Sequence, residues 1–108
     1  MRIQRRLAPL AMAALAIVTF AATALADDTH DTAMAPKSVT VTAKTGWHVN
    51  LDYPWKLVQG DTKLDKTHFA LTATSAVITD ATPGKWTLKG AVCSGEQCKT
   101  FSEDVVVP

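Results

Sequence analysis

The stretch Trp86–Val107, WTLKGAVCSGEQCKTFSEDVVV, decides the fold class of this 108-residue chain. Its two halves alternate between large apolar and small or polar side chains, as strands with one buried face do. The four-residue link 94–97 (SGEQ) has a common hairpin length, and its glycine supplies turn freedom. The segment therefore predicts an antiparallel hairpin in which Cys93 lies opposite Cys98.

This register sorts the side chains of the hairpin onto two faces. The small or polar face pairs Ala91 with Thr100, Lys89 with Ser102, and Thr87 with Asp104. The other face pairs Val92 with Lys99, Gly90 with Phe101, Leu88 with Glu103, and Trp86 with Val105. Pleat alternation therefore places the cysteine pair on the outward face near the hairpin tip. Lys99 and Glu103 interrupt the inner face, and a bulge or fraying near the tip would turn them outward.

The region before this hairpin predicts more short strands. Residues 38–43 (SVTVTA) alternate strictly, and further strands are predicted over 47–51, 55–59, 67–73 and 76–79. Residues 61–66 are charged and predict a loop. No segment combines a helical period with a start cap and a stop signal. Short strands with turns every 8–12 residues or so predict an all-β, immunoglobulin-like antiparallel sandwich of about seven strands.

The amino-terminal segment has the layout of a secretory signal peptide. A basic start with three arginines precedes the uncharged apolar stretch 7–20, and Ala24-Leu25-Ala26 matches a peptidase cleavage site. We expect cleavage after Ala26, which removes residues 1–26. The alternative is an uncleaved anchor, because residues 7–26 are about long enough to span a bilayer.

Cleavage at this position defines the exported chain. Residues 27–37 are polar and aperiodic and predict a flexible tail, so the β-domain is expected to span 38–108. All arginines leave with the signal, and eight lysines against ten carboxylates give a net charge of −2. This charge argues against nucleic acid or an anionic membrane as a partner. The expected location is the periplasm or the exterior, where a disulfide persists.

Two interpretations of Cys93 and Cys98 stay open. A bond between them closes a short loop and constrains the unfolded chain by about 2 kcal/mol, which fits a structural staple of modest value. An exposed disulfide is also open to attack by a thiolate, which fits a redox-active pair. A metal site is a weaker alternative, because two thiolates without a nearby histidine pair are incomplete ligands. We therefore predict no metal and no cofactor.

The remaining candidate residues carry weaker signals. His30 is fourth after the expected cleavage, whereas an amino-terminal copper site needs histidine in third place. His48 and His68 are solitary and flank strands, so we interpret both as ordinary strand residues. The three tryptophans are interpreted as core or rim packing rather than as a binding groove. The serines show no arrangement with a base and an orienting group, so hydrolase chemistry has no support.

The segment 46–54 (GWHVNLDYP), followed by a strand ending in Cys93 and a short loop to Cys98, resembles the N-terminal domain of DsbD, a membrane thiol–disulfide reductant conductor. That domain has an immunoglobulin-like fold, and its two cysteines shuttle electrons to periplasmic partners. Its cysteine spacing is one residue longer than here. The resemblance implies a redox role for Cys93 and Cys98 and a periplasmic thiol–disulfide protein as partner.

Together these features predict an exported accessory or binding domain that carries a hairpin disulfide. The alternative is thiol–disulfide exchange, as the resemblance implies. An enzymatic role is not assigned, and an oxidoreductase is the one class of enzyme that the residues leave open.

Overall fold

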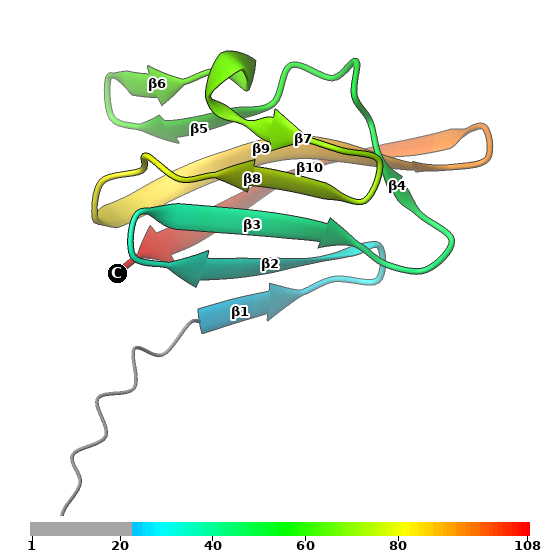
Figure 1. Cartoon of the computed structure of the whole chain (residues 1–108), viewed down its shortest axis with the longest axis horizontal. Coiled ribbons are helices and arrows are strands. Elements are labelled where there is room, and N and C mark those ends of the chain that lie inside the picture. The colour runs from blue at the N-terminus through cyan, green and yellow to red at the C-terminus, as the bar shows by residue number, and fades with distance from the viewer. Residues whose placement is uncertain (1–22) are drawn as a thin grey trace, which may run out of the picture.

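The computed structural model describes residues 23–108, which form two antiparallel β-sheets packed as a sandwich (Figure 1). The first sheet has the order β1 (Thr23–Ala26), β2 (His30–Ala35), β3 (Ser38–Ala43), β8 (Ser75–Ile78) and β7 (Ala70–Leu71). The second has the order β10 (Gln97–Val107), β9 (Gly84–Ser94), β5 (Lys56–Gln59) and β6 (Thr62–Leu64), with β4 (His48–Val49) also paired to β9. The predicted all-β antiparallel sandwich is confirmed.

The β9–β10 hairpin has the predicted register. The two strands pair over eleven positions, from Gly84 opposite Val107 to Ser94 opposite Gln97, with Cys93 opposite Cys98. No bulge turns Glu103 outward in this hairpin, because Glu103 stays opposite Leu88 in an unbroken ladder. The large apolar face of the hairpin packs into the core, as the alternation predicted.

Two tryptophans fill the centre of the sandwich. Trp55 and Trp86 are fully buried, which confirms their interpretation as core residues. Their indole N–H groups donate to backbone carbonyl oxygens of Asn50 and Thr82, at 2.9 and 2.8 Å. Trp55 lies across Gly90, where a Cβ atom would stand 2.3 Å from the nearest ring carbon. Glycine at this strand position therefore makes room for the indole.

The prediction of a flexible tail over 27–37 is wrong, because β2 lies within it. β2 pairs with β3 at six positions and buries His30, Thr32 and Met34. Burial alternates along β2, but two of its three inward residues, His30 and Thr32, are polar. The sequence of β2 is therefore similar to that of a solvated segment. The β-domain therefore begins before residue 38. Of the predicted signal peptide, residues 1–22 lie outside the described part of the chain, and Thr23–Ala26 form β1.

The middle of the chain also differs from the prediction. Part of the predicted loop 61–66 is β6, and the predicted strand 67–73 is shortened to β7 behind a 3-10 turn, Lys66–His68. This turn forms because the Asp65 carboxylate accepts hydrogen bonds from the backbone and hydroxyl of Thr67. With β1, β2 and β6 included, residues 23–108 hold ten strands instead of about seven. Among these residues, no helix is long and apolar enough to cross a membrane.

Candidate functional site

The disulfide joins an interior strand to an edge strand at the tip of the β9–β10 hairpin. Cys93 and Cys98 are bonded to each other, as predicted. Cys93 lies on β9 between β10 and β4 and is 5% exposed. Cys98 is exposed, because β10 is the last strand of the sheet. The two halves of the disulfide therefore differ strongly in their access to solvent.

The short strand β4 lies on the other side of Cys93. β4 pairs with β9 antiparallel, with His48 directly opposite Cys93 and Val49 opposite Val92. Directly opposite residues project from the same face of a sheet, so His48 stands beside the disulfide on the outward face. Val49 points inward and is buried, which anchors β4 to the core. The backbone N–H of Asn50 then donates to the Ala91 carbonyl at 3.0 Å and extends the attachment.

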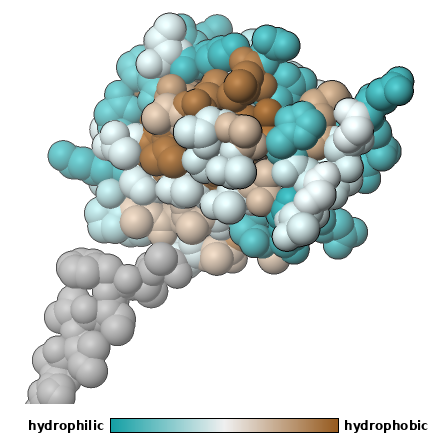
Figure 2. Space-filling model, turned by 45° about the vertical axis from the view of Figure 1, so that its right-hand side comes forward, coloured by the Kyte–Doolittle hydropathy of each residue, from teal (hydrophilic) through white to brown (hydrophobic). Residues whose placement is uncertain are grey.

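The disulfide and β4 border an open depression of about 410 Å³. Its lining consists of His48, Val49, Asn50, Leu51, Asp52, Cys93, Gly95 and Cys98. Leu51 is 47% exposed there and gives the rim an apolar side chain. Figure 2 turns this side of the molecule forward, and apolar side chains gather in the upper part of that view among hydrophilic ones. Cys98 therefore opens onto a depression whose rim is part apolar.

Asn50 fixes the loop that forms one wall of this depression. Its side-chain oxygen accepts from the Asp52 N–H at 2.9 Å, and its carbonyl accepts from the Trp55 indole. The Lys66 ammonium donates to the Leu51 carbonyl from outside the loop. The loop is thus hydrogen-bonded to the core residue Trp55, and this contact fixes the distance between the loop and the disulfide.

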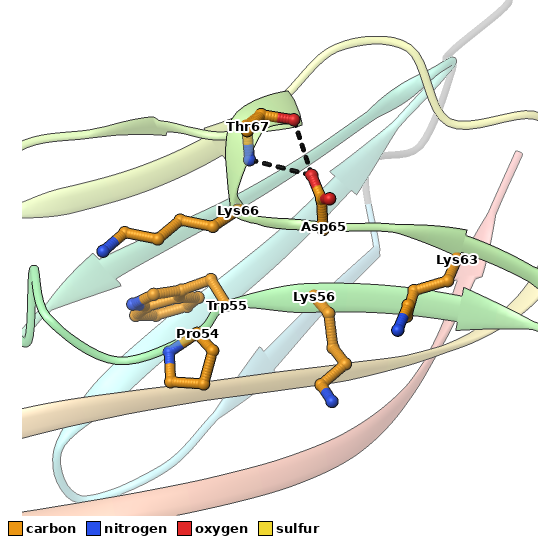
Figure 3. A pocket seen from close by; sticks show the side chains of 7 residues that line it. All are labelled: Pro54, Trp55, Lys56, Lys63, Asp65, Lys66 and Thr67. Carbon is orange, nitrogen blue, oxygen red and sulfur yellow. Dashed lines mark hydrogen bonds between the residues drawn. The ribbon is translucent and has the colours of Figure 1, made fainter.

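A second depression, of about 230 Å³, lies around Trp55 and the 3-10 turn (Figure 3). Three lysines line it, at positions 56, 63 and 66, together with Pro54. Their side chains extend in different directions rather than toward one point, as Figure 3 shows. Asp65 turns its carboxylate to Thr67, and these hydrogen bonds lower the pKa of Asp65. This depression has a basic rim but no converging group.

A buried polar network joins the two sheets where β10, the edge strand of the second sheet, faces β2 of the first. The ring nitrogens of His30 are 2.8 Å from the Thr29 hydroxyl and 3.1 Å from the Glu103 carboxylate, which also accepts from Thr32 at 2.7 Å. His30 stacks on Phe101 with ring centroids 3.9 Å apart. Burial raises the pKa of Glu103, but the hydrogen bonds from His30 and Thr32 outweigh it and hold this pKa below its usual value.

This network explains the inward position of Glu103 and the role of His30, which the sequence did not determine. Glu103 remains on the inner face, because His30 and Thr32 of the opposite sheet satisfy its carboxylate. Both nitrogens of His30 are engaged within the protein, which gives this side chain a structural role. The other inward charge, Lys99, lies 5.6 Å over the Trp47 ring at the hairpin tip.

The sequence located the cysteines but missed their neighbour. His48 was interpreted as an ordinary strand residue, whereas the structure places it opposite Cys93 in the ladder. The one feature of the sequence that could have indicated the orientation of His48 is the apolar Val49 that follows it and points inward. His68 is exposed and pairs with Asp80 at 2.8 Å, far along the chain from the cysteines. Within residues 23–108, no three His, Cys, Asp or Glu side chains are grouped to hold a metal ion.

Comparison with known proteins gives no relative from which a role can be transferred. No protein-family model, curated protein or solved structure matches this chain.

Proposed function

We propose that this chain is an exported domain that exchanges disulfides with a protein partner through Cys93 and Cys98. One observation carries the proposal: the exposed half of the disulfide, Cys98, opens onto a depression with a part-apolar rim. A thiolate must approach one sulfur of a disulfide to exchange with it, and Cys98 is the half that solvent reaches. The sequence resemblance to the N-terminal domain of DsbD supports the same function.

The fold has little need of this bond as a staple. The hairpin is already closed by eleven residue pairs, and its inner face is held in the core. A bond across six residues adds about 2 kcal/mol by the loop-entropy relation, less than a bridge between distant segments. A disulfide that contributes so little and sits at an accessible tip is better suited to turnover than to stabilisation.

The exchange reaction follows from the difference in exposure. A thiolate of a partner dithiol attacks the Cys98 sulfur, the Cys93–Cys98 bond breaks, and its electron pair leaves on the Cys93 sulfur. The second thiolate of the partner then attacks the partner sulfur of the mixed disulfide and releases the Cys98 thiolate. The partner is oxidised by two electrons to a disulfide, and this domain is reduced to a dithiol.

The second candidate is an accessory or binding domain whose disulfide never turns over. The near-complete burial of Cys93 favours it, because a shielded sulfur is a poor target for attack. In that case the exposed rim around Leu51 would bind a partner without any redox step.

Two measurements separate these functions. We expect the disulfide to equilibrate with glutathione at a reduction potential near −200 mV, whereas structural disulfides lie below about −300 mV. We also expect Cys93→Ser, which keeps the exposed Cys98, to form a mixed disulfide with glutathione about tenfold faster than Cys98→Ser does. A potential far below −300 mV, or equal trapping by the two variants, contradicts the exchange mechanism.

A further inference from the structure

We propose that His48 controls the protonation of Cys93, so that the buried half of the pair is released and regenerated as a thiolate. This inference rests on the proposed exchange function and assigns a residue to it. Sequence spacing does not suggest the role, because His48 and Cys93 lie on different strands that are far apart along the chain.

Two independent observations bring His48 to the disulfide. In the ladder between β4 and β9, His48 is the direct partner of Cys93. Directly opposite residues have Cβ atoms about 4.5–5.5 Å apart and project from the same face. His48 and both cysteines also line the same depression, so its side chain faces the volume that the disulfide faces.

The chemistry needs a positive charge at this position, because the leaving sulfur departs as a thiolate. When a partner attacks Cys98, the electron pair of the broken bond goes to Cys93, and a leaving thiol of lower pKa departs faster. Cys93 is 5% exposed, and burial disfavours a bare thiolate. A histidine imidazole exchanges protons near neutral pH, and its protonated form lowers the pKa of a neighbouring thiol. His48 therefore offsets the burial of Cys93 by forming a thiolate–imidazolium pair.

The other charges around the pair do not perform this task. Asp52, which lines the same depression, carries a negative charge that disfavours a thiolate. Glu96 lies in the hairpin loop and has the same sign. Lys99 projects to the inner face and lies over the Trp47 ring. Among the described residues that line the depression, His48 is the one side chain that can become positive.

The test measures the titration of Cys93 alone. In the reduced Cys98→Ser protein, the ultraviolet absorbance of the thiolate is followed against pH, with and without His48→Gln. We expect His48→Gln to raise the titration midpoint of Cys93 by about one pH unit or more. His68→Gln is the matched control, since this histidine is also exposed but pairs with Asp80, and it should leave the midpoint unchanged. His48→Lys should restore a low midpoint, because it returns a positive charge.

A kinetic measurement checks the same idea in the intact disulfide. Reduction by dithiothreitol should slow about threefold in His48→Gln, since the rate depends on the pKa of the leaving thiol. Equal midpoints with glutamine and histidine at position 48 overturn the role of His48. If the disulfide equilibrates with glutathione in that case, the exchange function stands without it. If the disulfide resists glutathione, the exchange function itself fails, whatever the midpoint is.

Discussion

Replacing Glu103 should destabilise the domain strongly, because its carboxylate bridges the two sheets. Its carboxylate joins β10 of the second sheet to His30 and Thr32 on β2 of the first. His30 and Thr32 are 1% and 0% exposed, so water cannot take over the lost hydrogen bonds. Glu103→Ala therefore leaves two buried polar groups without their partner.

The magnitude follows from these two contacts. An unsatisfied buried polar group costs about 1–3 kcal/mol, so two of them give about 2–4 kcal/mol at neutral pH after some relaxation. For a domain of this size, 1 kcal/mol changes Tm by about 4–8 °C, and the expected loss is therefore about 8–32 °C. Glu103→Gln keeps an acceptor oxygen but no charge, and it should cost about half as much.

Urea denaturation followed by tryptophan fluorescence measures this loss, since both core tryptophans report on unfolding. The pKa of Glu103 is lowered in the folded state, so its contribution to stability is present above the unfolded pKa of about 4.3. That contribution is lost as the pH falls through the lower folded value. The difference between the wild type and Glu103→Gln should therefore shrink in acid.

Asp104→Asn is the matched control for this prediction. Asp104 is the next residue on β10, but it is exposed and accepts only from the Thr87 hydroxyl at 3.3 Å. Its substitution should cost less than about 0.5 kcal/mol, as surface changes usually do. The reasoning is refuted if Glu103→Ala costs no more than this control at neutral pH, or if the cost of Glu103→Gln grows in acid.

Two further substitutions test the core and the hairpin. Gly90→Ala places a Cβ atom 2.3 Å from the Trp55 ring and should lower stability by about 1–3 kcal/mol, with the exposed Ser102→Ala as a neutral control in thermal melts. A Gly90→Ala protein as stable as this control would contradict the packing of Trp55. Replacing both Cys93 and Cys98 by alanine should cost about 2 kcal/mol and leave the far-ultraviolet circular dichroism unchanged, whereas an unfolded variant would assign the disulfide a structural role.

The hairpin could be predicted from sequence because one assumption, the position of Cys93 opposite Cys98, determines the whole register of its two strands. Once Cys93 is placed opposite Cys98, the other predicted pairs of β9 and β10 follow, and all eight agree with the structure. The ladder extends beyond them by one pair at the tip and two pairs at the other end. The same applies to β3, whose strict alternation gives its bounds and its buried face. In both cases the information is local, since apolar residues mark the inward side of each strand.

The rest depended on contacts between distant segments. β2 was missed because its inward His30 and Thr32 are polar, and they are buried only because Glu103, some seventy residues away, satisfies them. The position of His48 was missed for the same reason: β4 has two residues, too few for a pattern, and its register is set by β9. Polar partners across a sandwich leave no periodic signal in either strand.

If the chain is exported and cleaved as proposed, strand β1 bears on the timing of that cleavage. The bond expected to be cut, between Ala26 and Asp27, joins β1 to its turn into β2. In the folded domain the Asp27 N–H donates to the His30 carbonyl, and its carboxylate accepts from Thr29. Cleavage of an extended chain at this bond therefore competes with closure of the turn. Whichever event comes first decides whether the first sheet keeps its fifth strand or ends in an open row of backbone groups on β2.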